Sequence, residues 1–221
     1  FDYAQEGVYD LLSGRGTFAW DGKSETVERK DCFHEGAILL HVPQNTKVTI
    51  TAETETEVAV ARTENKRSFE AKLMRPEDCL CANEERGAGQ MNECSTRMVR
   101  TFFDRSNCPE TNFFIGEVVH FPGKWSSYPP HQHVEPEMYY YKFLPENGYG
   151  LAEYGDDAYK VKHNDLTGMP ANVTHSQAAA PGYAEYYLWC IRLQDDKNII
   201  TTTVKEYEWV TAPDAKYFPD I

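Results

Sequence analysis

The sequence lacks a long apolar run, a surplus of cations and a dense pattern of cysteines. Its apolar stretches, such as residues 36–40 and 183–191, are far shorter than the roughly 20 residues that a membrane-spanning helix needs. Its 22 Lys and Arg face 35 Asp and Glu, and the formal net charge of -13 would repel a phosphate backbone. We therefore expect neither a membrane nor a nucleic acid as a partner.

The six cysteines are scattered along the chain, unlike the close spacing of a secreted disulfide framework. This pattern predicts reduced thiols and a cytoplasmic protein. Cys79 and Cys81 are separated by a single residue and have no second pair, so they do not predict a zinc site. Because the chain begins at Phe1 without a Met or a signal-like segment, we expect it to be incomplete at its N-terminus.

What the sequence does contain favours short strands. It has 14 Tyr, 11 Phe and 14 Gly, with 12 Pro as punctuation. Residues 48–61 alternate apolar and polar side chains around a Glu-rich turn, which predicts a half-buried hairpin. Further strands are predicted at 137–143, 149–154 and 185–192, and a helical turn near 68–74 within a charged connection at 64–95. We expect an all-β sandwich or barrel.

One short pattern occurs twice. Pro43 and Asn45 precede Val48 at the same spacing at which Pro170 and Asn172 precede His175. Asn tolerates the left-handed backbone of a tight turn, so both segments predict the same strand-turn-strand corner. The chain would then hold two copies of one β unit, with a possible ligand position occupied by His in the later copy and by Val in the earlier one.

The segment with the most chemical content is 123–137. His131 and His133 are two residues apart, so on a strand both imidazoles project from one face and can share a metal. Such a pair alone is more often structural or solvated. Pro136 favours a turn that brings Glu137 beside the pair, and His175 follows later. Three imidazoles and a carboxylate suit Mn, Fe, Co, Ni or Zn, and the spacing does not choose among them.

These motifs resemble those of the cupin superfamily, where His-x-His, a short gap and Glu are followed by Pro-x-Gly-x-x-His; here Asn172 stands at the usual glycine. The runs WSSYPPHQH, EMYYYK, PANVTHSQAAAPGY and YYLW resemble the bicupin isomerases of the 5-deoxy-glucuronate isomerase type, which act in inositol catabolism. The pectin-degradation ketol-isomerases are a more distant likeness. The segment LLSGRGTFAWDG resembles a strand of a first cupin.

The resemblance implies a bicupin in which residues 1–95 form a degenerate N-terminal cupin and residues 96–221 a metal-binding one. It implies that one divalent metal is held by four ligands, His131, His133, Glu137 and His175. It further implies a cytoplasmic aldose-ketose isomerase that converts a deoxy-uronate, 5-deoxy-D-glucuronate, to 5-dehydro-2-deoxy-D-gluconate in myo-inositol catabolism. We also expect a homo-oligomer and a small sugar acid as the substrate.

Such an isomerase moves a proton between adjacent carbons while a metal polarises the two oxygens. Glu137 and Tyr141 are the candidate catalytic residues, because residues 137, 139 and 141 share one strand face. Tyr139 and Tyr141 can equally be aromatics of the barrel core. A uronate carboxylate needs a cation, for which Lys124 and Arg192 are the candidates, although either can be a solvated surface charge.

Two other functions fit the same pattern. A cupin with three His and one Glu can bind Fe(II) and activate oxygen as a dioxygenase, in which case activity requires O₂ and iron. A non-catalytic cupin that binds sugar acids would keep the fold but lose the metal ligands, and the complete ligand set argues against it.

Overall fold

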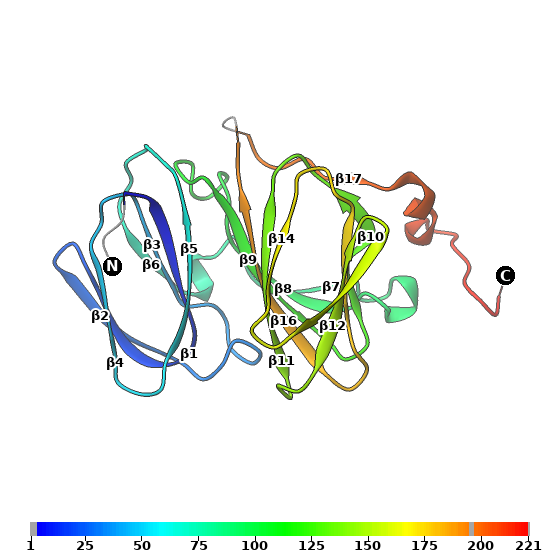
Figure 1. The fold of residues 1–221 in the computed structure, drawn as a ribbon, viewed down its shortest axis with the longest axis horizontal. Coiled ribbons are helices and arrows are strands. Elements are labelled where there is room, and N and C mark those ends of the chain that lie inside the picture. Colours follow the sequence, from blue (N-terminus) through cyan, green and yellow to red (C-terminus); the bar gives the residue numbers. More distant parts are fainter. Residues whose placement is uncertain (1–3, 195–196, 221) are drawn as a thin grey trace. The chain divides into compact units, whose positions relative to one another are not determined.

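The computed structural model describes residues 4–194 and 197–220, and strands dominate it (Figure 1). This confirms the predicted all-β class. The strands are β1 (Glu6–Trp20), β2 (Lys23–Arg29), β3 (Leu39–Val42), β4 (Val48–Ala52), β5 (Glu57–Thr63), β6 (Lys72–Met74), β7 (Cys81–Arg86), β8 (Arg97–Phe103), β9 (Phe113–His120), β10 (Trp125–Gln132), β11 (Glu137–Leu144), β12 (Tyr149–Tyr154), β13 (Asp157–Lys162), β14 (Leu166–Met169), β15 (His175–Ala179), β16 (Ala184–Arg192) and β17 (Thr202–Thr203). Short 3-10 helices η1 (Pro76–Asp78), η2 (Met91–Glu93) and η3 (Lys205–Thr211) complete the described chain.

The chain divides into two compact units that alternate along the sequence. The first unit comprises residues 1–83, 100–116 and 192–198, and the second comprises residues 84–99, 117–191 and 199–221. The chain passes from one unit to the other within β7, β8, β9 and β16. The division of the chain into cupins at 1–95 and 96–221 stays a prediction.

The first unit is organised around β1. The first half of β1 pairs with β3 and β5 and the second half with β2 and β4. Between the halves the register with β5 shifts after Leu11, and Gly14 has a φ of +97°. A Cβ at Gly14 would lie 2.3 Å from the Glu55 carbonyl oxygen, so the bend of β1 requires glycine. The core of this unit includes Tyr9, Leu11, Phe18, Trp20, Leu40 and Val48.

Two predictions about local structure were wrong. The two strands within 48–61 exist, but β4 and β5 each pair with β1, so they do not form the expected hairpin. Where a helical turn was expected near 68–74, Lys72–Met74 form strand β6, which pairs with β3, and the 3-10 turn η1 begins two residues after β6 ends. Pairing of β6 with β3 outweighs the local helical preference of that segment.

The repeated corner is confirmed. β3 ends at Val42 and β4 begins at Val48, just as β14 ends at Met169 and β15 begins at His175. Asn45 and Asn172 both have left-handed backbones, with φ of 65° and 59°. The two strands therefore start at the matched positions, with a buried Val48 in one unit and a buried His175 in the other.

The second unit contains the strands that position the predicted site. One sheet has the order β13-β12-β15-β10-β17, and another has the order β14-β11-β16-β9-β8-β7. Side chains bond between the two sheets, since the Tyr141 hydroxyl on β11 donates to the Gln177 Oε1 on β15 at 3.0 Å. The space between these sheets is filled largely by aromatic side chains, among them Tyr139, Tyr141, Phe143, Tyr187 and Trp189.

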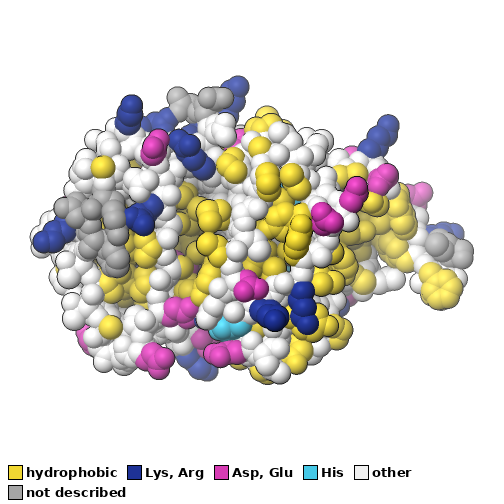
Figure 2. Space-filling model, in the orientation of Figure 1, with side chains coloured by type: hydrophobic (Ala, Val, Ile, Leu, Met, Phe, Trp, Pro, Cys, Tyr) yellow, Lys and Arg dark blue, Asp and Glu magenta, His cyan; other side chains and the backbone are white. Residues whose placement is uncertain are grey.

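The face of the molecule in Figure 2 carries basic and acidic side chains scattered among polar and apolar ones. None of the helices within the described ranges is long and apolar enough to span a membrane. All six cysteines are free thiols, as predicted from their spacing.

Candidate metal centre

Four side chains from three neighbouring segments meet inside the second unit. His131 lies near the end of β10, directly opposite His175, the first residue of β15. His133 follows the end of β10, and Glu137 opens β11 after the turn that contains Pro136. His131 is half-buried, and the other three are buried. The structure thus brings together the set that the sequence predicts.

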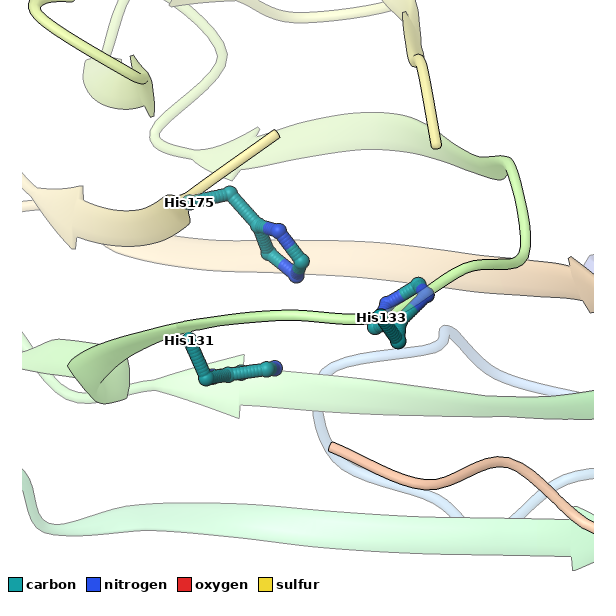
Figure 3. Close-up of side chains that lie close together, drawn as sticks. All are labelled: His131, His133 and His175. Carbon is teal, nitrogen blue, oxygen red and sulfur yellow. The ribbon is translucent and has the colours of Figure 1, made fainter. Parts of the chain in front are cut away.

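The three imidazoles face one another (Figure 3). Each offers one ring nitrogen, and these three nitrogens all lie within 4.8 Å of one another. Glu137 completes the group, because its Oε2 is 3.1 Å from the His133 Nε2 and 3.4 Å from the His175 Nε2. Within residues 4–194 and 197–220, this triad is the one group of three His, Cys, Asp or Glu close enough to hold an ion.

Backbone carbonyls set the orientation of each ring. The Nδ1 of His133 contacts the Glu135 carbonyl at 2.8 Å, and the Nδ1 of His175 contacts the Val173 carbonyl at 3.0 Å. His131 makes a longer contact of 3.3 Å with the Ser127 carbonyl. A carbonyl can only accept, so Nδ1 carries a proton in each ring, and in a neutral imidazole the Nε2 lone pair is left for another partner.

The charges in the group are tuned by burial and by one another. Burial opposes ionisation of Glu137, but its contacts with His133 and His175 outweigh burial and hold its pKa at about 2. Burial, together with the nearby His175, lowers the pKa of His131 to about 4. At neutral pH the group therefore combines a carboxylate with an uncharged His131 imidazole, a donor set that suits a borderline divalent ion.

The geometry fits such an ion. The buried Nε2 of His175 has no hydrogen-bond partner among the described residues. The lone pairs of the His133 and His175 Nε2 atoms point at the Glu137 carboxylate, which is unfavourable unless protons or a cation lie among them. Two ligand atoms about 2.1 Å from one ion lie about 3.0–3.4 Å apart, depending on coordination geometry. The contacts of Glu137 fall in that range.

Tyr141 is buried on the same face of β11 as Glu137, as strand parity predicts. Its hydroxyl donates to the Gln177 Oε1 at 3.0 Å and lies 3.3 Å from the Thr167 Oγ1. Burial raises the pKa of Tyr141 well above its ordinary value, so the phenol stays protonated at neutral pH. Its hydroxyl is therefore a fixed hydrogen-bond donor.

Gln177 is a site residue that the motif search missed. It is two residues after His175 on β15, so its side chain leaves the same face about 7 Å along the strand. The bond from Tyr141 fixes which amide atom is the acceptor, and it leaves Nε2 as a buried donor without a partner among the described residues. The period-two alternation of a strand, applied onward from His175, would have found it.

The two predicted carboxylate-binding cations lie elsewhere. The Lys124 carbonyl accepts from the Ala179 amide. Ala179 lies four residues after His175 on β15, so the backbones of Lys124 and His175 are about 13 Å apart along the strand. Arg192 is exposed in the first unit, with its guanidinium 4.0 Å from the Glu64 carboxylate. Their roles toward a substrate stay predictions.

A second buried polar group lies between the sheets. The His120 Nε2 is 2.7 Å from the Ser126 Oγ, which is 2.6 Å from the Tyr187 hydroxyl. Glu185 lies with its Oε2 3.9 Å from the His120 Nδ1, and its carboxyl oxygens have no hydrogen-bond partner in the described chain. A Cβ on Gly150 would lie 2.1 Å from this Oε2, so glycine makes room for the acid. Burial raises the pKa of Glu185 to about 8 and lowers that of His120 to about 3.

The chain is similar to known proteins over most of its length. The model of the KduI/IolB family matches residues 2–210. The 5-deoxy-glucuronate isomerase of Geobacillus kaustophilus is 30% identical over 230 residues, which cover 95% of this chain and 76% of that protein. The enzyme of the same name from Geobacillus thermodenitrificans is 28% identical, and the match covers 80% of this chain and 64% of that protein.

Solved structures share the fold. An IolB-like protein of Salmonella typhimurium superposes with a TM-score of 0.85 at 23% identity, covering 95% of this chain and 83% of that one. A cupin 2 conserved barrel domain protein of Leptotrichia buccalis superposes with a TM-score of 0.51 at 14% identity, covering 86% and 76%. These likenesses confirm the predicted cupin fold.

The buried acid gives a prediction about stability. In the folded chain Glu185 stays protonated up to about pH 8, whereas it ionises near 4.5 when the chain unfolds. The contribution of Glu185 to the free energy of unfolding is therefore fully present below pH 4.5. It decreases as pH rises toward 8, by up to about 1.4 kcal/mol per pH unit. Gln does not titrate, so Glu185→Gln should gain stability over the wild type from pH 5 to 8.

Urea unfolding followed by tryptophan fluorescence at several pH values measures this gap. Glu208→Gln, at an exposed position, is the matched control and should track the wild type within about 0.5 kcal/mol. A gap between Glu185→Gln and the wild type that does not change with pH would contradict the raised pKa.

Proposed function

The chain belongs to the KduI/IolB family and is an isomerase, and from this we propose that it converts 5-deoxy-D-glucuronate to 5-dehydro-2-deoxy-D-gluconate. The observation that carries the proposal is the convergence of three imidazoles and one carboxylate in a chain whose curated relatives are named 5-deoxy-glucuronate isomerase. The substrate would be a small sugar acid, and the reaction would belong to myo-inositol catabolism.

We propose that one divalent metal, Zn, Mn, Fe, Co or Ni, is held by His131, His133, Glu137 and His175. The inward Nε2 atoms and the ionised Glu137 support this assignment. When bound, such an ion supplies Lewis acidity to the substrate's carbonyl and neighbouring hydroxyl oxygens. Glu137 adds the negative charge that tightens binding of the cation, and the backbone carbonyls behind His133 and His175 keep both rings in place.

The reaction needs no outside oxidant. One carbon loses a proton as its hydroxyl becomes a carbonyl, while the adjacent carbonyl carbon gains a proton and its oxygen becomes a hydroxyl. The two changes cancel, so the chain has only to orient the substrate, exclude water and stabilise the charge that develops on oxygen.

In this scheme Tyr141 acts through Gln177. A phenol that stays protonated and donates to Gln177 Oε1 cannot also accept a substrate proton at neutral pH. Tyr141 is therefore a positioning residue that holds the Gln177 amide with its N–H donors free. Gln177, next along the strand face from His175, would donate to a substrate hydroxyl beyond the two oxygens that meet the metal.

The reaction class is tested with the metal-loaded enzyme and 5-deoxy-glucuronate under anaerobic conditions. Proton and carbon NMR should show the aldehyde signal replaced by a ketone signal at the same rate with and without O₂. In D₂O, deuterium on the carbon next to the carbonyl would report the proton transfer, and product formation is followed alongside because a shielded base can return the same proton. Consumption of the substrate that requires O₂ and gives no ketose would instead indicate that the protein is a dioxygenase.

Removing one imidazole tests the metal site. His133→Ala should lose most of its bound metal, and activity should fall by more than the ~10–100-fold that loss of an outer hydrogen-bond partner of a ligand costs. Elemental analysis of the purified protein measures the metal. His34→Ala, which removes an exposed imidazole paired with Asp31, is the control and should keep both metal and activity. Full metal occupancy in His133→Ala would refute the ligand assignment.

The role of Tyr141 is tested by Tyr141→Phe, with Tyr140→Phe on the opposite strand face as the matched control. Loss of one orienting hydrogen bond should lower kcat/KM by about tenfold while metal content stays unchanged. Gln177→Leu should cause a similar loss, and the double variant should lose little more, because both changes remove one interaction. A fall of ~10²–10⁴-fold in kcat for Tyr141→Phe alone would identify Tyr141 as the proton carrier instead.

A further inference from the structure

Arg97, the first residue of β8, is a buried cation of the second unit. Only 9% of its surface is exposed. Its Nη1 donates to the Ser95 carbonyl at 2.7 Å and to the Ser95 Oγ at 2.9 Å. Both bonds use the same one of its three guanidinium nitrogens. The N–H groups of Nε and Nη2 make no hydrogen bond within the described chain, so they are left for another partner.

The guanidinium of Arg97 has no acid to balance its charge. Among residues 4–194 and 197–220, no Asp or Glu forms an ion pair with it. Glu84, on the neighbouring strand β7, instead accepts from Arg86 through both carboxylate oxygens, at 3.1 and 2.7 Å. Burial lowers the pKa of Arg97, as expected for a charge that has lost water without gaining a carboxylate. An anion that reached Arg97 would offset this cost.

The charge of Arg97 acts on the interior of the second unit. Burial lowers the pKa of His120 to about 3, and the charge of Arg97 adds to this effect. Burial raises the pKa of Tyr187 to about 12, and the charge of Arg97 opposes that rise. The two rings contact each other edge to face, with their centroids 5.2 Å apart. Arg97 is therefore close to both members of this interior pair.

This pair lies one layer along the interior from the metal ligands. The Tyr187 hydroxyl is 2.6 Å from the Ser126 Oγ, and Ser126 is opposite Gln177 where β10 pairs with β15. Gln177 follows His175 by two residues, which is about 7 Å along the strand. An extended chain of six carbons spans about 6 Å, because each C–C bond of about 1.5 Å advances it by about 1.3 Å. A six-carbon acid whose carbonyl end lies at the metal ligands would therefore place its carboxylate in this layer.

We propose that Arg97 receives the carboxylate of the substrate and so selects a sugar acid over an uncharged sugar. This inference rests on the proposed isomerase function. The Nε and Nη2 donors lie on one edge of the planar guanidinium and match the two oxygens of a carboxylate. Arg97 would thus take the role that the sequence suggested for Lys124 and Arg192.

Arg97→Gln is tested with the metal-loaded enzyme and two substrates, 5-deoxy-glucuronate and 5-deoxy-glucose, in which a hydroxymethyl group replaces the carboxylate. For the acid, kcat/KM should fall by about 10–100-fold, mainly through a higher KM, and for the uncharged sugar it should change less than about threefold. Metal content should not change. Arg86→Gln removes an exposed guanidinium on the adjacent strand and is the control, which should keep the preference for the acid.

Binding is measured apart from turnover by calorimetry, with the acid obtained by reducing the aldehyde of 5-deoxy-glucuronate to an alcohol. Its dissociation constant should rise at least about tenfold in Arg97→Gln. It should rise by less, about threefold, in Arg97→Lys, which keeps the charge but loses the planar pair of donors. Circular dichroism checks that the variants fold. If Arg97→Gln does not fold, Arg97→Lys decides, and an unchanged dissociation constant in it overturns the proposal.

An equal loss of kcat/KM for the acid and the sugar in Arg97→Gln overturns the proposal, as does an acid-specific loss of the same size in Arg86→Gln. An acid-specific loss in Lys124→Gln or Arg192→Gln, with none in Arg97→Gln, would assign the carboxylate to that residue instead. If the wild type isomerises neither compound, the isomerase function fails and calorimetry alone decides about Arg97. No binding of the reduced acid, or binding that Arg97→Gln leaves unchanged, then overturns its role.

Discussion

The hydrogen bonds from three imidazole Nδ1 atoms to backbone carbonyls are the constraint on which the site depends. Each bond fixes a tautomer, and with it the direction of an Nε2 lone pair. The Glu135 and Val173 carbonyls belong to the turns that precede β11 and β15, and the Ser127 carbonyl lies within β10, so the fold itself orients the group. Glu137 joins the rings because the turn at Pro136 starts β11 beside them.

The sequence was most informative where one residue type answers a specific backbone or chemical need. Asn45 and Asn172 both have left-handed backbones, and each lies three residues after one strand ends and three residues before the next begins. The side chains of His131, His133 and Glu137 likewise meet, as their spacing along the chain predicts. Local patterns sufficed here because each constraint acts over a few residues.

The sequence did not predict which strands pair when they are far apart along the chain. Alternation identified β4 and β5 as strands but could not say that both lie against β1, since a period of two is the same whichever strand is the neighbour. Gln177 and Glu185 carry no motif, and their environment arises only when strands far apart in sequence close around them.

The bent strand β1 also bears on how the chain is made. β1 leaves the ribosome before the strands it pairs with, which extend as far as β5, and residues 100–116 and 192–198 belong to the same unit. Arg105 donates to the carbonyls of residues 194 and 197, which emerge 89 and 92 residues later. The first unit is therefore completed only after residue 197 has emerged, and until then its apolar strands depend on partial pairing or chaperones for protection.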